Sequence, residues 1–273
     1  MNGVDPSGAR ATYDRRLLLA GTLRNAVLEL WQVERYGTDS YGDADYVSIY
    51  GLRPADWYAR GVRLLGRTAV ECTRDALGSA IAADVAAVAS RLPNARATLI
   101  ADPFAGSCNT LYWLQRCLPE ARSVGFESDP GVFQLTARNL ATLALPIELH
   151  HIDYRVGLAS LAAVSDELLI VFVAPPWGDA LDPVAGLDLR RTYPPVVEVI
   201  DLLSERFPRN PVLCAIQVYE KLEARAVAEV KTRFDWSDLR IYPLSTPGQD
   251  HGLMLGTQRW DQGLRIACTR DIG

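Results

Sequence analysis

The chain has 273 residues, of which 49% are hydrophobic and 22% charged, a composition typical of soluble globular proteins. Its 28 Lys and Arg residues against 33 Asp and Glu residues give a formal net charge of −5. Because phosphate neutralisation dominates the affinity of proteins for nucleic acids, this balance counts against a large RNA or DNA partner.

The cysteines and the apolar runs indicate where in the cell the protein is located. The five cysteines are scattered and show no C-x-x-C spacing, so we expect reduced thiols in a cytoplasmic protein, with no disulfide framework and no zinc site. Charged residues flank the short apolar run near the start, which does not make a signal peptide. No uncharged apolar run approaches the roughly 18 residues of a spanning helix, so we expect no membrane segment.

Residues 1–95 are expected to form a mainly helical extension, separate from a domain over 96–273. Within the extension, residues 78–92 are rich in alanine and have a helical period. Residues 36–58 are rich in turn formers and aromatics. They are either a loop whose Tyr and Trp side chains pack back on the domain, or a lid over a substrate pocket, since long loops in compact domains tend to carry function.

From about Ala97 the chain alternates strand-like and helix-like segments, which indicates a doubly wound α/β sheet. Strands are predicted at 97–102, 123–127, 147–152, 168–174, 211–219, 239–244 and 252–260. Helices are predicted at 108–118, 130–143, 193–207 and 221–233, with a turn or short helix near 157–164. Only "STPGQDH" separates the last two strands, so they should pair as an antiparallel hairpin.

The loop after the first strand, "ADPFAGSCNT", has the position of a cofactor-binding turn. Gly106 permits a tight turn, and the helix that begins near Cys108 directs free backbone N–H groups at a ligand. A dinucleotide site would show G-x-G-x-x-G, in which the later glycines let the backbone approach a pyrophosphate, but here only Gly106 is present. A cofactor with a carboxylate and no pyrophosphate fits better, and S-adenosyl-L-methionine is such a cofactor.

Two acidic residues follow the next two strands. Glu127 is placed to accept hydrogen bonds from both ribose hydroxyls, and Asp153 from the adenine amino group. The alternatives are structural: Glu127 is a charge at a helix N-terminus, with Asp129 as the N-cap before Pro130, and Asp153 is a turn residue. The three signals occur in order at the ends of successive strands, which favours the cofactor interpretation.

The fourth strand ends abruptly in "APPWGDA", residues 174–180. In an open α/β sheet, ligands bind outside the carboxyl ends of the strands, so a stiff aromatic turn there is placed to hold a ligand. The alternative is a turn that ends the strand and a Trp177 that fills the core. The adjacent His150 and His151 point to opposite sides of a strand, which argues against joint metal binding, and we assign no role to any histidine.

Residues 97–260 resemble class I methyltransferases, and "APPW" resembles the [DNS]-P-P-[YFW] motif of those that methylate nitrogen. The pattern is most similar to that of the RNA cap guanine-N2 methyltransferases (trimethylguanosine synthases), whose motif is S-P-P-W-G. Segment 61–73, "GVRLLGRTAVECT", is similar to the region those enzymes place before the first strand. The resemblance implies a Rossmann-like sheet of seven strands whose last strand is antiparallel, with S-adenosyl-L-methionine as cofactor and S-adenosyl-L-homocysteine as product.

The resemblance also implies the site. It implies that the carbonyls at Ala174 and Pro175 hold the N–H groups of the acceptor nitrogen. It also implies that Trp177 stacks on the planar ring that carries this nitrogen. Asp179 is the nearest base for a protonated amine or guanidinium, with Asp182 next; the alternative for both is a solvated loop carboxylate. The cofactor contacts are expected at Thr73, Asp102, Pro103, Phe104, Ala105, Gly106, Asn109, Glu127, Asp153 and Ala174, with no metal.

Two departures from the family pattern matter. Ala174 stands where the family has Asp, Asn or Ser, so the usual side-chain acceptor is missing. Cys108 replaces a glycine that is common after A-G-S, which we expect to change only local packing.

We therefore expect an N-methyltransferase (EC 2.1.1 class) that acts on a small-molecule amine, guanidine or aminated heterocycle, because the chain is acidic and has no appended RNA-binding module. An RNA guanine-N2 methyltransferase is the alternative that P-P-W-G supports. A non-catalytic binding protein with a methyltransferase fold is a third, favoured by the loss of the polar residue at Ala174.

Overall fold

The computed structural model describes residues 15–92, 98–164, 167–182, 184–243 and 251–260. Seven strands of this part form one sheet in the order β3-β2-β1-β4-β7-β9-β8. Their bounds are β1 Thr98–Asp102, β2 Arg122–Glu127, β3 Glu148–His151, β4 Leu168–Val173, β7 Val212–Tyr219, β8 Trp236–Tyr242 and β9 His251–Gln258. The first five are mutually parallel, and β9 runs antiparallel between β7 and β8.

This topology confirms the predicted seven-stranded sheet and its antiparallel hairpin. β4 is buried at every position, as expected for a parallel strand covered on both faces. Successive residues of β4 contribute to two different apolar cores. Ile170 and Phe172 face the first core, while Leu169, Val171 and Val173 face the second.

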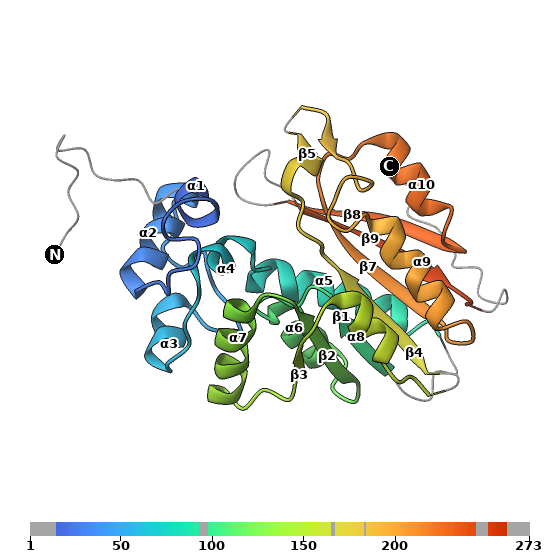
Figure 1. Cartoon of the computed structure of the whole chain (residues 1–273), viewed down its shortest axis with the longest axis horizontal. Coiled ribbons are helices and arrows are strands. Elements are labelled where there is room, and N and C mark those ends of the chain that lie inside the picture. The colour runs from blue at the N-terminus through green and yellow to red at the C-terminus, as the bar shows by residue number, and fades with distance from the viewer. Residues whose placement is uncertain (1–14, 93–97, 165–166, 183, 244–250, 261–273) are drawn as a thin grey trace.

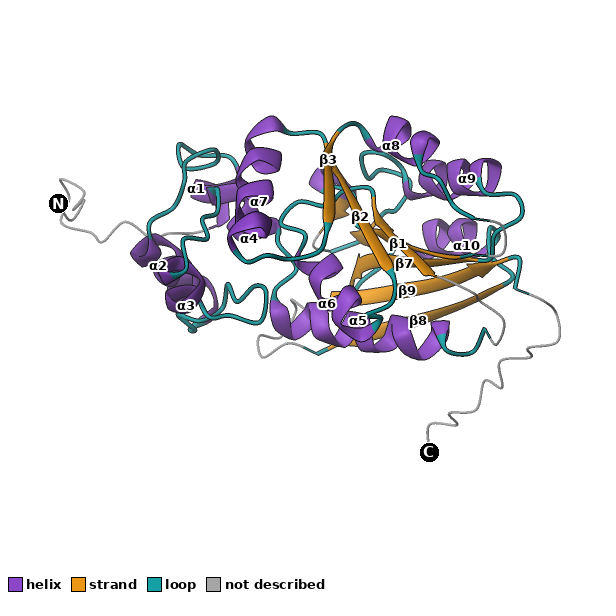
Figure 2. Ribbon diagram, turned by 90° about the horizontal axis from the view of Figure 1, so that it is seen from below, coloured by secondary structure: helices purple, strands orange, loops and turns teal. Residues whose placement is uncertain are grey.

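Helices cover both faces of the sheet. Figure 2 shows α5 and α6 on one side, and α8, α9 and α10 on the other. The bounds of these helices are α5 Asp75–Ala89, α6 Asn109–Cys117, α8 Tyr154–Ser160, α9 Val196–Arg206 and α10 Ala224–Lys231. α7, Pro130–Thr142, follows β2 and packs on β3. The sheet is therefore the middle layer of three, so its carboxyl edge is where side chains from several strands meet.

The N-terminal helices lie together at one end of the molecule (Figure 1). They are α1 Arg15–Leu19, α2 Leu30–Tyr41, α3 Pro54–Ala59 and α4 Gly66–Glu71. Leu18, Val33 and Trp57 in this part belong to the same apolar core as Ile100 and Ile170 of the sheet. The residues on the two sides of the expected boundary near 95 therefore share one continuous core.

Several element boundaries differ from those expected. Segment 36–58, expected as a loop, is helical at both ends: α2 continues to Tyr41, where Gly42 ends it at a φ of +72°, and Pro54 begins α3. Tyr36, Tyr50 and Trp57 of this segment are buried. The short helix expected near 157–164 begins earlier, at Tyr154. α9 begins at Val196, after the consecutive prolines at 194–195. The loop "STPGQDH" falls mostly outside the described residues.

A short hairpin follows the tip of β4. The 3-10 turn η1, Gly178–Ala180, leads into β5 Leu181–Asp182, which pairs antiparallel with β6 Gly186–Leu187. The Leu187 N–H donates to the Lys221 carbonyl at 2.8 Å, so the segment after the tip is attached to the loop after β7.

Candidate functional site

The turn after β1 has the conformation that its sequence predicts. Gly106 adopts a φ of +49°, and the nearest atom to a Cβ added there is the Phe104 carbonyl oxygen at 3.9 Å. Cys108 also lies in the left-handed region, at a φ of +58°. This region favours glycine, which explains why a glycine is common at that position and corrects the expectation that Cys108 changes only packing.

Asp102 ends β1 inside the protein. Its side chain accepts a hydrogen bond from the Phe104 N–H at 2.9 Å and is 2% exposed. Burial raises the pKa of Asp102 to about 7, since desolvation disfavours the carboxylate. Pro103 and Ala105 are buried beside it, and Phe104 is partly buried.

Glu127, at the end of β2, lies directly against the turn. Its Oε2 accepts from the Gly106 N–H at 3.1 Å, and its Oε1 accepts from the Asp129 N–H at 2.7 Å. Burial raises the pKa of Glu127 despite these two donors. Thr136 donates its hydroxyl to the Gly106 carbonyl at 2.8 Å, so both sides of this glycine are held.

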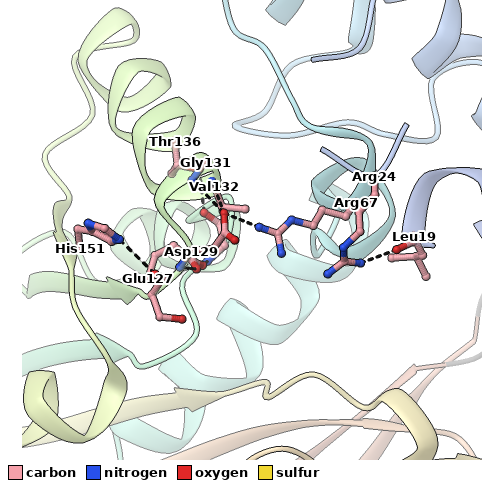
Figure 3. A network of polar contacts seen from close by, with 11 residues as sticks. Leu19, Arg24, Arg67, Glu127, Asp129, Gly131, Val132, Thr136 and His151 are labelled. Carbon is pink, nitrogen blue, oxygen red and sulfur yellow. Dashed lines mark hydrogen bonds and ion pairs between the residues drawn. The ribbon is translucent and has the colours of Figure 1, made fainter. Parts of the chain in front are cut away.

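Asp129 caps α7 as predicted. Its Oδ1 accepts from the N–H groups of Gly131 at 2.9 Å and Val132 at 3.0 Å. The guanidinium of Arg67, from α4, reaches the same carboxylate with its Nη2 at 2.5 Å, as Figure 3 shows. Nε and Nη2 of Arg67 are buried, so the ion pair with Asp129 is shielded from water. The carboxylate is charged, because hydrogen bonds and Arg67 lower its pKa.

Asn109 begins α6 and joins three segments. Its Oδ1 accepts from the Tyr50 N–H at 2.6 Å. Its Nδ2 donates to the Thr73 carbonyl at 2.7 Å and to Asp75 Oδ1 at 3.1 Å. The amide therefore makes its contacts within the protein, and it fixes Thr73 and the segment around Tyr50 beside the turn.

Asp153 caps α8 from an exposed position and accepts from the Arg155 N–H at 2.9 Å. Its location after β3, beside the end of β2, is the one that the sequence predicts. Asp153 therefore also has a structural role, as in the alternative that we considered: it holds the turn that leads into α8.

The tip of β4 presents its residues in different environments. Pro175 is buried, Ala174 and Trp177 are partly buried, and Asp179 is exposed. The Pro176 carbonyl accepts from the Tyr193 N–H at 3.3 Å, and the Trp177 carbonyl accepts from the Ala180 N–H at 2.8 Å. Among the described hydrogen bonds of turns and loops, none ends on the carbonyl of Ala174 or Pro175.

Two aromatic residues that the sequence did not single out lie against Trp177. The ring of Tyr219, at the end of β7, is centred 6.3 Å away, and that of His251, at the start of β9, is centred 5.8 Å away. His251 pairs with Tyr219 across the strands. An antiparallel β9 starts at the edge where the parallel strands end, so the predicted hairpin contained the signal by which His251 could have been located at this edge.

Asp182, the second candidate base, caps a turn. Its Oδ1 accepts from the N–H groups of Val184 at 2.7 Å and Ala185 at 2.8 Å, and these bonds lower its pKa. This is the structural role of a loop carboxylate that we considered for it.

The residues at the turn after β1 and at the end of β2 fit S-adenosyl-L-methionine. Glu127 supplies acceptor oxygens at the end of β2, as ribose hydroxyls require, and Gly106 places no side chain at the turn. The described residues contain no group of three or more possible metal ligands. None of the described helices is both long and apolar enough to cross a membrane.

No protein-family model and no curated protein matches this chain. Among solved structures it is similar to the methyltransferase domain of METTL16, with 11% identity over 69% of this chain and 70% of that one and a TM-score of 0.48. It is also similar to precorrin-6y C5,15-methyltransferase from Geobacter metallireducens GS-15, with 12% identity over 68% and 89% and a TM-score of 0.44. A third is the methyltransferase yhhF of Escherichia coli, described as putative, with 17% identity over 68% and 88% and a TM-score of 0.40.

The class of fold follows from the strand order itself. A sheet ordered 3-2-1-4-5 along the parallel strands, with an antiparallel last strand inserted beside the fifth, is the class I methyltransferase fold. The fold alone does not determine the acceptor, because function resides in the site.

Proposed function

We propose that the chain is an S-adenosyl-L-methionine-dependent methyltransferase that transfers a methyl group to an amino or guanidino nitrogen of a small molecule. The observation that carries this proposal is the tip of β4. A partly buried Trp177 follows two rigid prolines at the carboxyl edge of the sheet, next to the turn that Glu127 holds. This is where an acceptor ring would meet the methyl group of a cofactor.

The carbonyls at the tip support nitrogen as the acceptor atom. Those of Pro176 and Trp177 accept hydrogen bonds from the protein, whereas those of Ala174 and Pro175 accept none from the described turns and loops. Two adjacent carbonyl acceptors suit the two N–H groups of an amino nitrogen. The Ala174 backbone thus replaces the side-chain acceptor that the family carries at this position.

The chemistry is a displacement in line with the breaking bond. The cofactor supplies an electrophilic methyl group, whose bonding electron pair stays with the sulfur. The carbonyls of Ala174 and Pro175 orient the acceptor nitrogen, and Trp177 fixes the plane of its ring. Orientation of this kind contributes on the order of 7 to 11 kcal/mol to lowering a barrier. The nitrogen loses one proton, and exposed Asp179 is our candidate for the base that receives it if the acceptor is a protonated amine or guanidinium.

In the proposed cofactor site, Glu127 accepts from the ribose and Asp153 from the adenine amino group. Thr73, Asn109 and residues 102–106 surround the amino-acid end. The division into an extension over 1–95 and a catalytic domain over 96–273, with 36–58 near the substrate, belongs to this proposal.

The test begins with calorimetry on S-adenosyl-L-homocysteine. It continues with transfer of labelled methyl from S-adenosyl-L-methionine to a panel of amines, guanidines and aminated heterocycles, with matched alcohols and phenols as controls. We expect binding of the product and transfer to nitrogen compounds alone. The absence of product binding would reject the proposal and favour the non-catalytic alternative, and transfer only to the oxygen compounds would reject a nitrogen acceptor.

One observation favours RNA guanine-N2 methylation as a second candidate. Tyr193 is 83% exposed, and its N–H donates to the Pro176 carbonyl, so an exposed aromatic side chain stands beside the P-P-W-G tip. Such a ring can stack a neighbouring base. The net charge of −5 is the reason that we rank this candidate second.

A further inference from the structure

Three polar side chains from distant segments form a chain of contacts beside the tip. The Thr73 hydroxyl donates to Gln217 Oε1 at 3.0 Å, and Gln217 Nε2 lies 3.4 Å from His251 Nδ1. Thr73 precedes α5, Gln217 lies on β7, and His251 starts β9. Thr73 and Gln217 are each 9% exposed, so this contact is shielded from water.

The chain of contacts has a direction. The Gln217 side-chain oxygen accepts a hydrogen bond from the Thr73 hydroxyl. The NH2 group of the same amide therefore faces His251. An NH2 group only donates, so His251 Nδ1 must present a lone pair. A neutral imidazole with a lone pair on Nδ1 carries its proton on Nε2.

The two ends of the chain lie at the two halves of the proposed site. At one end, the His251 ring is tilted by 33° to the ring of Trp177. At the other end, the Thr73 carbonyl accepts from the Asn109 side chain, which belongs to the helix after the cofactor turn. Gln217 is therefore the link between the segment expected to meet the amino-acid end of the cofactor and the aromatic group expected to meet the acceptor.

We propose that Gln217 is a positioning residue that fixes the tautomer and the orientation of His251 against Trp177, and that it transmits cofactor binding at Thr73 to this ring. The functional part of this inference rests on the proposed function. It has one mechanistic consequence: His251 Nδ1 is committed to Gln217, so it does not take the proton of the acceptor nitrogen.

The tautomer is tested without any substrate. The chain has three histidines, so ring 1H–15N correlation spectra are simple, and His251→Gln identifies the His251 signals. We expect an unprotonated Nδ1 and a protonated Nε2 in the neutral ring. Gln217→Glu should reverse this, because a carboxylate oxygen facing Nδ1 only accepts and so requires a proton there.

Matched variants at Thr73 test the direction of the chain if Gln217→Glu does not fold. Thr73→Ser keeps the hydroxyl and should keep the wild-type ring signals. Thr73→Val removes the donor, so the Gln217 amide is free to turn over and a ring form protonated at Nδ1 should appear. A wild-type ring protonated at Nδ1, or the same ring form in Thr73→Val as in Thr73→Ser, would overturn the assignment.

The link to the cofactor is tested by adding S-adenosyl-L-homocysteine to the full chain. The His251 ring signals should shift in the wild type but not in Gln217→Leu, whose affinity for the compound should fall about two- to tenfold, as for one lost hydrogen bond. Binding that leaves the wild-type His251 signals unchanged would reject the link and leave the proposed function standing. No binding at all would reject the proposed function, and the tautomer would still be decided by the preceding spectra.

Discussion

The backbone N–H of Gly106 donates to the side chain of Glu127 over 3.1 Å, which joins the turn after β1 to the end of β2. Glu127 thus has a structural partner in addition to the ribose that we propose for it. Because Thr136 holds the carbonyl of the same glycine, contacts within the protein fix the turn on both sides. A preformed turn lowers the entropy that a cofactor loses on binding.

The first prediction concerns Glu127→Ala, which should weaken the binding of S-adenosyl-L-homocysteine by about 1.5 to 3 kcal/mol, the range for hydrogen bonds to a charged group. Calorimetry measures this directly. Glu127→Gln is the matched control, since its amide oxygen can still accept from Gly106. It should lose affinity while keeping a melting temperature near that of the wild type. Unchanged affinity in both variants would reject the ribose contact.

The second prediction concerns Asp102, whose pKa burial raises to about 7. A carboxyl with a pKa of roughly 4 in the unfolded chain favours folding most below that pH, and this contribution is lost as the pH rises through about 7. Asp102→Asn is neutral at every pH and keeps an oxygen for the Phe104 N–H. The stability of this variant relative to wild type should therefore increase from pH 5 to pH 8, on the order of 2 to 4 kcal/mol in the free energy of unfolding.

Urea denaturation at the two pH values, without cofactor, measures this gain. Asp179→Asn alters an exposed carboxylate and serves as the control, with an expected change in stability that is small at both pH values. A gain for Asp102→Asn that is equal at pH 5 and pH 8 would contradict the raised pKa.

The third prediction compares two helix caps. Asn caps helices about as well as Asp, so Asp153→Asn should cost only a few tenths of a kcal/mol. Asp129→Asn also removes the negative charge opposite Arg67, whose side chain is 12% exposed. We expect an additional loss of about 1 to 3 kcal/mol in urea denaturation, because the buried guanidinium then loses the carboxylate with which it forms an ion pair. Equal losses in the two variants would show that the ion pair does not stabilise the fold.

The fourth prediction concerns Trp177→Ala, which should lower turnover by orders of magnitude while cofactor affinity changes little. Trp177 is partly buried, so its loss of stability should be smaller than the roughly 3 to 5 kcal/mol typical of a buried aromatic residue. Trp177→Phe keeps a stacking face and should retain much of the activity. The measurement needs an acceptor from the panel described above. If the folded fraction of Trp177→Ala is fully active, the stacking role is wrong.

The fifth prediction is that RNA binds weakly at most and that its affinity falls steeply with salt. Filter binding at two ionic strengths, with capped and uncapped RNA, measures this. Tight binding of capped RNA at physiological salt would favour the second candidate function. Tyr193→Ala should then reduce that binding, by about 1 to 3 kcal/mol for one stacked base.

The features that the sequence determined by itself are local. The apolar run of β4 and its stop at Pro175 and Pro176 predict the strand and its rigid end, since both depend on neighbouring residues. Asp129 before Pro130 predicts the start of α7, and the short link "STPGQDH" predicts the antiparallel hairpin. Regular alternation of such elements restricts the sheet to few topologies, which is why the fold could be predicted.

The turn-rich segment 36–58 shows the limit of local reasoning. Its glycines and aspartates indicated a loop, yet Tyr36 and Trp57 are completely buried and the helices that carry them pack on the core. Burial of these side chains overrides weak local preferences, because propensities differ by less than the free energy gained when a large aromatic side chain leaves water.

The contacts that only the tertiary structure decided join residues far apart in the chain. Tyr50 binds Asn109 across 59 residues, and Thr73 binds Gln217 across 144. Arg67 meets Asp129, and His251 meets Trp177, through packing between separate elements. No periodicity or spacing encodes such pairs, since each depends on the distance and orientation that packed helices and strands set between their side chains.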